Sequence, residues 1–249
     1  MNLEARITVT KTLLAKIESE FAPAAFASSF GAEDMVLAHL IARDYRGIEV
    51  FTLDTGRLPG ETLSLIHETE ARYELPVSVY TPRPDAVEEY VKTRGLNAFY
   101  ESLDNRKTCC HIRKVEPLGR ALTGKKSWIT GLRREQAASR RDLAESAFDA
   151  DHGITKFNPL IEWSSDDVWA FIHANDVPYN ALHDRGYPSI GCEPCTRAIK
   201  PGEDPRAGRW WWENADAGGR QECGLHVEGT IKTVDISDLK IGTYGKARA

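Results

Sequence analysis

The first half of the chain alternates short apolar runs with segments of helical periodicity. Each strand-like run is followed by a helical pattern, and the pairs are 24–30 with a helix from Glu33, 49–55 with a helix from Gly60, and 77–81 with a helix from Asp85. Such alternation predicts βαβ units. The fold class is therefore expected to be α/β, a parallel twisted sheet with helices on both faces.

The remaining elements are less regular. Apolar residues at helical spacing predict an N-terminal helix, and a further strand is expected over 127–130. An extended piece over 157–163 precedes Ser164, whose spacing to Asp167 is that of a helix start. Pro, Gly and isolated charges then predict irregular structure over 178–219, which a compact domain usually keeps for function.

Length and composition set the class of protein. The 249 residues, 41% hydrophobic and 28% charged, are those of an ordinary soluble globular protein. We expect one α/β domain over 1–219 and a C-terminal segment over 220–249. The N-terminus lacks the pattern of a secretory signal and no run is long enough to span a membrane, so a cytoplasmic location is expected.

The charge distribution points to a small anionic ligand. A net charge of -5 argues against a nonspecific nucleic-acid binder. The cations nevertheless gather in two groups, namely Arg133, Arg134, Arg140 and Arg141 in the first, and Arg197, Lys200, Arg206 and Arg209 in the second. Arginine pairs bidentately with phosphate and sulfate oxygens, so these groups are candidate anion sites.

Two turns follow predicted parallel strands at the edge where open α/β sheets bind ligands. The first contains Ser28, Ser29, Phe30, Gly31, Glu33 and Asp34, and the second contains Leu53, Asp54, Thr55 and Gly56. Small residues at a helix start let backbone N–H groups approach an anion. The first turn alone is better explained as an ordinary βα connection in which Ser and Asp cap the helix. Two such turns on one edge strengthen the ligand-binding interpretation.

The five cysteines divide into two pairs and one single residue. Cys109 and Cys110 are adjacent, Cys192 and Cys195 form a C-x-x-C pair, and Cys223 stands alone. Four thiolates suit either a structural zinc ion or an iron–sulfur cluster. Adjacent cysteines disfavour zinc because they cannot close a relaxed loop around one ion, but the spacing leaves both alternatives open, along with buried unliganded thiols.

Cys223 is a candidate nucleophile. It is flanked by polar and small residues, which disfavours a core position, and His226 or nearby cations would lower the pKa of its thiol. Lys114 lies four residues beyond Cys110 and is expected on the same helical side. Its charge would then lie beside the predicted thiolate site.

Six motifs together resemble one family. They are SSFGAED, LDTGRLPGET, KTCCHIRKVEPL, TGLRREQ with RRD, GCEPC and ECGLH, in that order between Ser28 and His226. This set resembles the assimilatory adenosine 5'-phosphosulfate (APS) reductases, the cluster-containing branch of the sulfonucleotide reductase family. The resemblance implies an adenine-nucleotide α-hydrolase-like sheet, in agreement with the alternating pattern.

The resemblance also implies site residues and partners. It assigns a [4Fe-4S] cluster to Cys109, Cys110, Cys192 and Cys195, and catalysis to Cys223. It implies substrate contacts from the two turns and from Lys114, Gly131, Arg133, Arg141, Arg206, Arg209 and His226. The implied reaction reduces APS to sulfite and AMP through an S-sulfocysteine, with thioredoxin or glutaredoxin as reductant, in sulfate assimilation and cysteine biosynthesis. A homo-oligomer is left open.

Two rival interpretations remain. A reductase for the 3'-phosphorylated substrate (PAPS) would keep ECGLH, but such family members usually lack both cysteine pairs. A nonredox nucleotide-binding protein with a structural four-cysteine zinc site would make Cys223 incidental.

We expect the purified protein to be brown and to contain iron and acid-labile sulfide, because thiolate- and sulfide-ligated iron absorbs broadly in the visible. Elemental analysis and a visible spectrum check this. A colourless protein with zinc and no sulfide would contradict the cluster.

Overall fold

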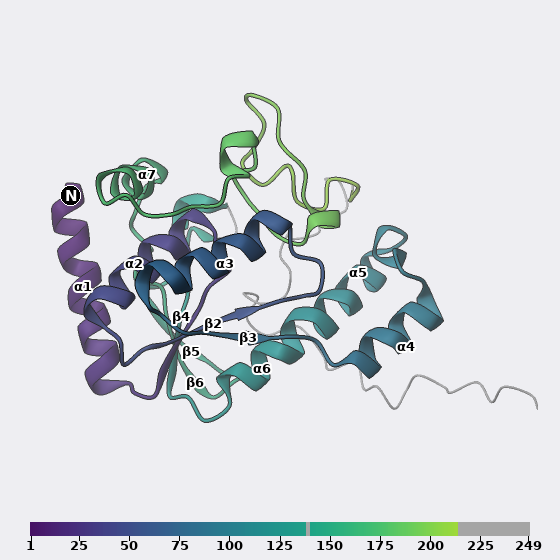
Figure 1. Ribbon diagram of the computed structural model, residues 1–249, viewed down its shortest axis with the longest axis horizontal. Coiled ribbons are helices and arrows are strands. Elements are labelled where there is room, and N and C mark those ends of the chain that lie inside the picture. Colours follow the sequence, from purple (N-terminus) through teal and green to yellow (C-terminus); the bar gives the residue numbers. More distant parts are fainter. Residues whose placement is uncertain (138–139, 214–249) are drawn as a thin grey trace, which may run out of the picture.

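Residues 1–137 and 140–213, which the computed structural model describes, form a six-stranded sheet in the order β3-β2-β1-β4-β6-β5 (Figure 1). The strands are β1 Ala24–Ala27, β2 Glu49–Leu53, β3 Val77–Tyr80, β4 Ser127–Ile129, β5 Ser146–Asp149 and β6 Ile154–Phe157. All neighbours from β3 to β6 pair in parallel. The βαβ alternation of the sequence is therefore confirmed.

The sheet is not wholly parallel, because β5 pairs with β6 in the antiparallel direction. The two strands form a hairpin whose turn is closed by the Gly153 N–H donating to the Asp149 carbonyl, 2.8 Å away. Gly153 has φ +68°, a conformation that glycine adopts without steric cost. The sequence pattern does not predict β5, a short edge strand that buries none of its residues fully.

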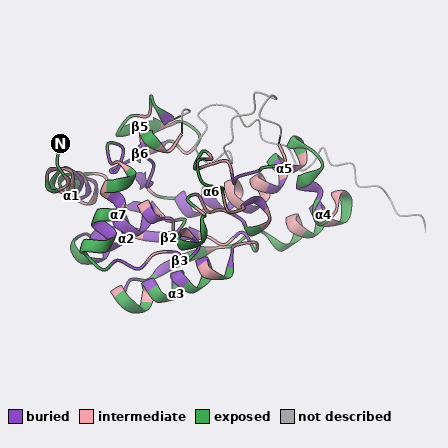
Figure 2. Ribbon diagram, turned by 90° about the horizontal axis from the view of Figure 1, so that it is seen from above, coloured by how far each residue is buried: buried purple, intermediate pink, exposed green. Residues whose placement is uncertain are grey.

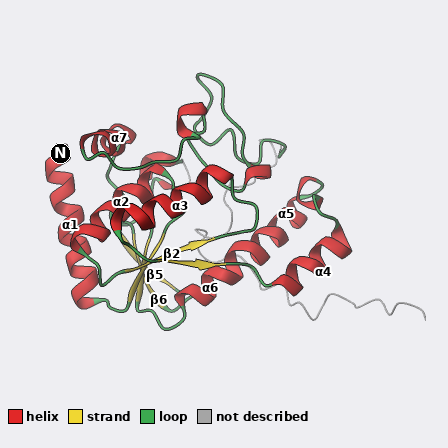
Figure 3. Cartoon of the chain, in the orientation of Figure 1, coloured by secondary structure: helices red, strands yellow, loops and turns green. Residues whose placement is uncertain are grey.

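Helices cover both faces of the sheet, as Figure 3 shows. Their bounds are α1 Leu3–Glu20, α2 Ala32–Asp44, α3 Gly60–Tyr73, α4 Pro84–Arg94, α5 Leu103–Cys110, α6 Glu116–Leu122 and α7 Ser165–Ala174. Alternate residues of β1 point to opposite faces: Phe26 packs with α1, α2, α3 and α7, whereas Ala25 packs with α6. The two-faced arrangement expected from the sequence is confirmed.

The helix that follows β1, α2, is the most buried of the described helices. In α2 every residue from Met35 to Ala42 is buried, and Figure 2 shows this helix largely in the colour of buried residues. A helix that is apolar on all sides needs cover on all sides. Neighbouring helices supply it, and they fix the N-terminus of α2 at the edge where β1 ends.

The start of α7 follows the prediction, but the segment before it does not. Ser164 Oγ accepts a hydrogen bond from Asp167 N at 3.1 Å, and Asp167 Oδ2 accepts one from Ser164 N at 2.8 Å. The extended piece expected over 157–163 is wrong, because β6 ends at Phe157 and turns follow. Asn158 anchors these turns by accepting a hydrogen bond from Thr130 Oγ1 at 2.6 Å.

Beyond α7 the described chain contains only short 3-10 turns, at His183–Arg185 and Glu193–Cys195, and one isolated bridge between Thr196 and Arg209. The irregular structure expected from Pro178 is confirmed as far as Glu213. Figure 1 shows this segment in green, above α3. Across residues 1–137 and 140–213, no helix has both the length and the apolar character needed to cross a bilayer.

Candidate functional site

A cavity of about 900 Å³ opens at the carboxyl ends of β1, β2 and β4. The chain runs from β1 outward to β2 and β3 and then returns to β4 on the other side of β1. The crevice at such a switch in strand order is the usual ligand site of open α/β sheets. The predicted binding edge and the observed cavity therefore coincide.

Most of the predicted substrate-binding residues line this cavity. They are Ser28, Ser29, Gly31, Glu33, Asp34, Leu53, Thr55, Lys114, Gly131, Arg133, Arg206 and Arg209. They come from the turns after three strands, from the segment after α5 and from the irregular segment after α7. The fold thus brings together residues that lie up to 181 positions apart in the sequence.

Some predicted residues lie elsewhere. Phe30 turns its side chain into the core, where it is 1% exposed, and Asp54 accepts a hydrogen bond from Gly56 N at 2.8 Å within the turn after β2. The structure brings Arg140 rather than Arg141 to the cavity wall; Arg141 lines an adjoining shallow hollow. The predicted Cys223 and His226 lie outside the described residues.

Asp34 joins the turn after β1 to the turn after β4. Its Oδ2 accepts hydrogen bonds from Ser29 N at 2.6 Å and Ser29 Oγ at 2.7 Å, and the carboxylate also accepts one from the Gly131 backbone. A Cβ on Gly131 would lie 2.2 Å from Asp34 Oδ1, so only glycine fits there. Burial, opposed by these hydrogen bonds, raises the pKa of Asp34 to about 6.

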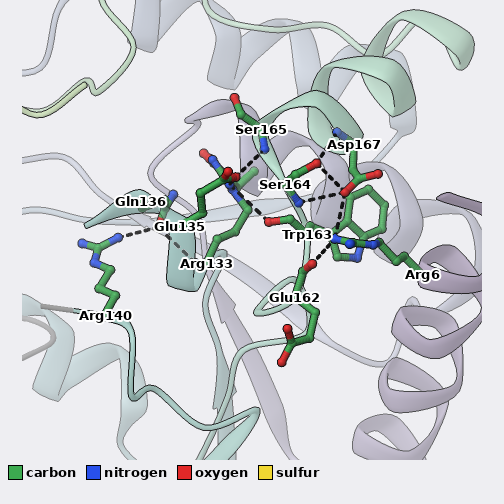
Figure 4. A network of polar contacts seen from close by, with 11 residues as sticks. Arg6, Arg133, Glu135, Gln136, Arg140, Glu162, Trp163, Ser164, Ser165 and Asp167 are labelled. Atoms are coloured by element: carbon green, nitrogen blue, oxygen red, sulfur yellow. Dashed lines mark hydrogen bonds and ion pairs between the residues drawn. The ribbon is translucent and has the colours of Figure 1, made fainter. Parts of the chain in front are cut away.

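Arg133 belongs to a network of polar contacts, in which Figure 4 shows it beside Glu135 and Trp163. Its guanidinium forms ion pairs with Glu33 at 2.8 Å and Glu135 at 3.1 Å, and it donates to the Trp163 carbonyl at 3.2 Å. The side chain is almost fully buried. With two carboxylates already beside it, Arg133 holds the wall together and has little capacity left for a bound anion.

Other cations line the cavity. Lys114, Arg140, Arg206 and Arg209 come from three segments. Arg209 is 7% exposed and donates from Nη1 to Ser189 Oγ at 3.2 Å, but its buried Nε has no hydrogen-bond partner among the described residues. A buried guanidinium with an unused donor is suited to receive an anion.

One wall of the cavity is aromatic, which the sequence pattern does not predict. Trp169, His173, Tyr179 and His183 line the cavity, and the Trp169 ring lies 5.1 Å from that of Tyr179 and 5.3 Å from that of His183. Burial lowers the pKa of His183, which favours its neutral form. The one sequence signal was the i, i+4 spacing of Trp169 and His173, which places both on one side of α7.

The four cysteines of the two pairs meet beside this cavity, in what we call the four-thiol site (Cys109, Cys110, Cys192 and Cys195). The first pair ends α5, directly before a π-helical turn, His111–Val115, of a kind that often marks functional positions. The second pair brackets the 3-10 turn at Glu193.

Burial dominates the chemistry of the four-thiol site. It raises the pKa of Cys195 to about 12, and the negative charges of the other three thiolates act in the same direction, while Lys114 opposes them. Lys114 also lines the cavity, so its ammonium connects the two sites electrostatically. Thr55 Oγ1 lies within hydrogen-bond distance of Cys192 Sγ, at 3.3 Å.

The donor set fits an iron–sulfur cluster. Across residues 1–137 and 140–213, no group of three or more His, Cys, Asp or Glu side chains is arranged around a single metal ion. Four soft thiols close enough to influence one another, in a dry pocket where free thiolates are costly, suit a centre that binds each at a separate corner.

Comparison with known proteins identifies related chains. Residues 23–198 match the phosphoadenosine phosphosulfate reductase domain. A Burkholderia cepacia protein named adenosine 5'-phosphosulfate reductase is 54% identical over 225 residues, covering 90% of this chain and 89% of that protein. A protein of the same name from Allochromatium vinosum is 54% identical over 214 residues, covering 86% of this chain and 82% of the relative.

Solved structures support the fold. Phosphoadenylyl-sulfate (PAPS) reductase from Candida auris, a phosphate complex, superposes with a TM-score of 0.64 at 28% identity, covering 80% of this chain and 98% of that one. Candida glabrata FMN adenylyltransferase superposes with a TM-score of 0.57 at 17% identity, covering 84% of this chain and 72% of that one. The expected adenine-nucleotide α-hydrolase-like fold is confirmed.

The raised pKa of Asp34 predicts a pH-dependent stability. Between 3.8 and about 6 the folded protein keeps a proton that the unfolded chain has lost, so the free energy of unfolding falls as pH rises through this window. The loss is on the order of 3 kcal/mol. Asp34→Asn should not show this decrease, because its side chain does not titrate. Denaturant titrations of both proteins at pH 4, 5, 6 and 7 would measure the free energy of unfolding.

The matched control is Asp44→Asn, which removes an exposed carboxylate paired with Lys11. Equal pH dependence in the wild type and Asp34→Asn would contradict the assignment to Asp34.

Proposed function

The chain belongs to the phosphoadenosine phosphosulfate reductase family, and from that premise we propose that it reduces adenosine 5'-phosphosulfate to sulfite and AMP. One observation carries the proposal: a single cavity joins nucleotide-type turns to a group of cations and adjoins the four-thiol site. Relatives that are 54% identical and carry the name adenosine 5'-phosphosulfate reductase support this substrate.

The nucleotide would occupy the cavity at the carboxyl edge of the sheet. Backbone N–H groups in the turn after β1 lie at the start of α2, where the helix dipole favours negative charge. Asp34 and Gly131 keep this turn close to the turn after β4. Lys114, Arg206 and Arg209 would meet the phosphosulfate, because a cationic wall compensates the charges of a dianionic ligand.

The four-thiol site would hold a [4Fe-4S] cluster, one thiolate at each corner. When bound, the cluster would cross-link α5 to the segment around Glu193 and set a fixed charge beside Lys114. The reducing equivalents in this proposal come from a dithiol protein. Lys114 would then orient between the thiolate charges on one side and the ligand on the other.

Catalysis would begin with attack of the Cys223 thiolate on the sulfur of the substrate's sulfate group. A sulfur–sulfur bond forms, the bond from sulfur to the bridging oxygen breaks, and AMP leaves with that oxygen. A thiolate of thioredoxin or glutaredoxin then attacks the Cys223 sulfur, releasing sulfite and leaving a mixed disulfide. The second thiol of the reductant resolves this disulfide, so that two electrons pass from the dithiol to sulfur.

Cations lower the barrier to the first step. A thiolate and a dianionic substrate repel each other, and positive side chains reduce this repulsion and stabilise charge on the departing phosphate. Arg209, buried with an unused donor, is the best placed of the described residues for this role. We place the reaction in the cytoplasm, in sulfate assimilation for cysteine biosynthesis.

Cys223→Ser tests the nucleophile. A serine hydroxyl at this position is a far weaker nucleophile at neutral pH, so sulfite formation should fall by roughly a thousandfold or more, as for other nucleophile deletions. Binding of APS and iron content should stay at wild-type levels. Sulfite release at the wild-type rate with thioredoxin would contradict the role of Cys223.

Turnover of the two sulfonucleotides tests the substrate. We expect kcat/KM with thioredoxin to be at least about a hundredfold higher for APS than for its 3'-phosphorylated form, a difference that unpaired charge in a cavity readily produces. Sulfite is measured for both substrates with the same enzyme preparation. Preference for the 3'-phosphorylated form would overturn the choice of substrate and leave the reaction class intact.

A further inference from the structure

The indole of Trp210 contacts two arginines from different parts of the chain. The Cζ atom of Arg106 lies over the ring at 4.5 Å from its centroid, and that of Arg209 lies over it at 4.7 Å. Trp210 is 1% exposed and packs with cysteines of the four-thiol site. Desolvated arginine–indole contacts of this kind are favourable and depend on geometry.

Arg106 ties this indole to α5. The arginine precedes Cys109 by one helical turn and is 2% exposed. Its Nε and Nη2 donate to the two carboxylate oxygens of Glu213, the Nη2–Oε2 distance being 3.1 Å. A buried guanidinium paired at two points has one orientation, so the position of Arg106 fixes the ring beside it.

Trp210 would not keep its place without such contacts. Its φ of +46° is the left-handed conformation, which a bulky side chain adopts only where its surroundings impose it. Its backbone N–H donates to the Cys195 carbonyl at 3.2 Å. If the Trp210 backbone left this conformation, the backbone of Arg209, the preceding residue, would move with it.

Arg209 reaches the cavity through a narrow space. A Cβ on Gly191 would lie 2.3 Å from Arg209 Nη2, so the guanidinium passes directly over a glycine. Ser189 Oγ and the Ile190 carbonyl accept from Nη1 at 3.2 and 3.3 Å. These contacts direct the guanidinium at the cavity, and the Trp210 ring covers its remaining face.

We propose that Arg106 is a positioning residue for Arg209, acting through Trp210. This inference rests on the proposed nucleotide-binding function and deepens it. In this way α5, which carries the first cysteine pair, positions Arg209 through contacts that do not include Lys114. The same ion pair fixes Glu213, the residue from which the chain continues toward Cys223.

The experiment measures AMP binding to the iron-containing protein by isothermal titration calorimetry. We expect Arg106→Met to weaken AMP binding at least about tenfold, or about 1.4 kcal/mol. Its iron content and visible spectrum should match the wild type. Arg94→Met is the matched control, because Arg94 also pairs with a carboxylate of α5, Asp104 at 2.8 Å, but on the surface; its affinity should be unchanged.

A double-variant cycle tests the route. If Arg106 acts through Arg209, adding Arg106→Met to Arg209→Met should cause no further loss of AMP affinity. Additive losses would overturn the proposal, as would wild-type affinity in Arg106→Met. Should Arg106→Met fail to fold or to keep its iron, Glu213→Gln replaces it in the same cycle with the same deciding outcomes.

The wild-type measurement separates the two proposals. Wild-type protein that binds no AMP contradicts the proposed function. Wild-type binding that Arg106→Met leaves intact contradicts only the inference about Arg106.

Discussion

Parallel pairing of β1 with both β2 and β4 is the constraint on which the site depends. Because these three strands run in one direction, their following turns emerge at one edge, and the cavity opens there. Asp34 then holds two of these turns together by accepting hydrogen bonds from Ser29 in the turn after β1 and from Gly131 in the turn after β4. Burial of this carboxylate is energetically unfavourable, and the raised pKa of Asp34 reflects that cost.

The wall of the cavity and the neighbouring helix α5 carry buried charges with specific partners. Arg133 pairs with Glu33 and Glu135, and Arg106 pairs with Glu213. Buried ion pairs contribute little net stability, because desolvation offsets much of the attraction, yet removing one partner is costly. Their value here is geometric. Each ion pair fixes a backbone segment, and those segments in turn position the cations that face the cavity.

The four-thiol site and the cavity depend on one another through the irregular segment after α7. Most backbone hydrogen bonds of this segment lie within it, and the Glu193 N–H, which donates to the Arg57 carbonyl at 2.8 Å, links it to the turn after β2. Its second cysteine pair packs with Cys109 of α5, and two of its arginines, Arg206 and Arg209, line the cavity. A cluster that joins the two cysteine pairs would therefore order the residues that meet the ligand, which gives it a role without any transfer of electrons.

The sequence by itself determined the alternating fold, the edge of the sheet at which the cavity opens, the pairing of four cysteines in the chain and the capped start of α7. Each of these features depends on residues close together in the sequence, and hydrophobic periodicity and helix-capping residues indicate it directly. Only the tertiary structure decided that Arg133 is held by carboxylates, that Arg140 faces the cavity and that Trp210 joins Arg106 to Arg209. These depend on partners distant in sequence, and a side chain's direction follows from packing that local spacing does not encode.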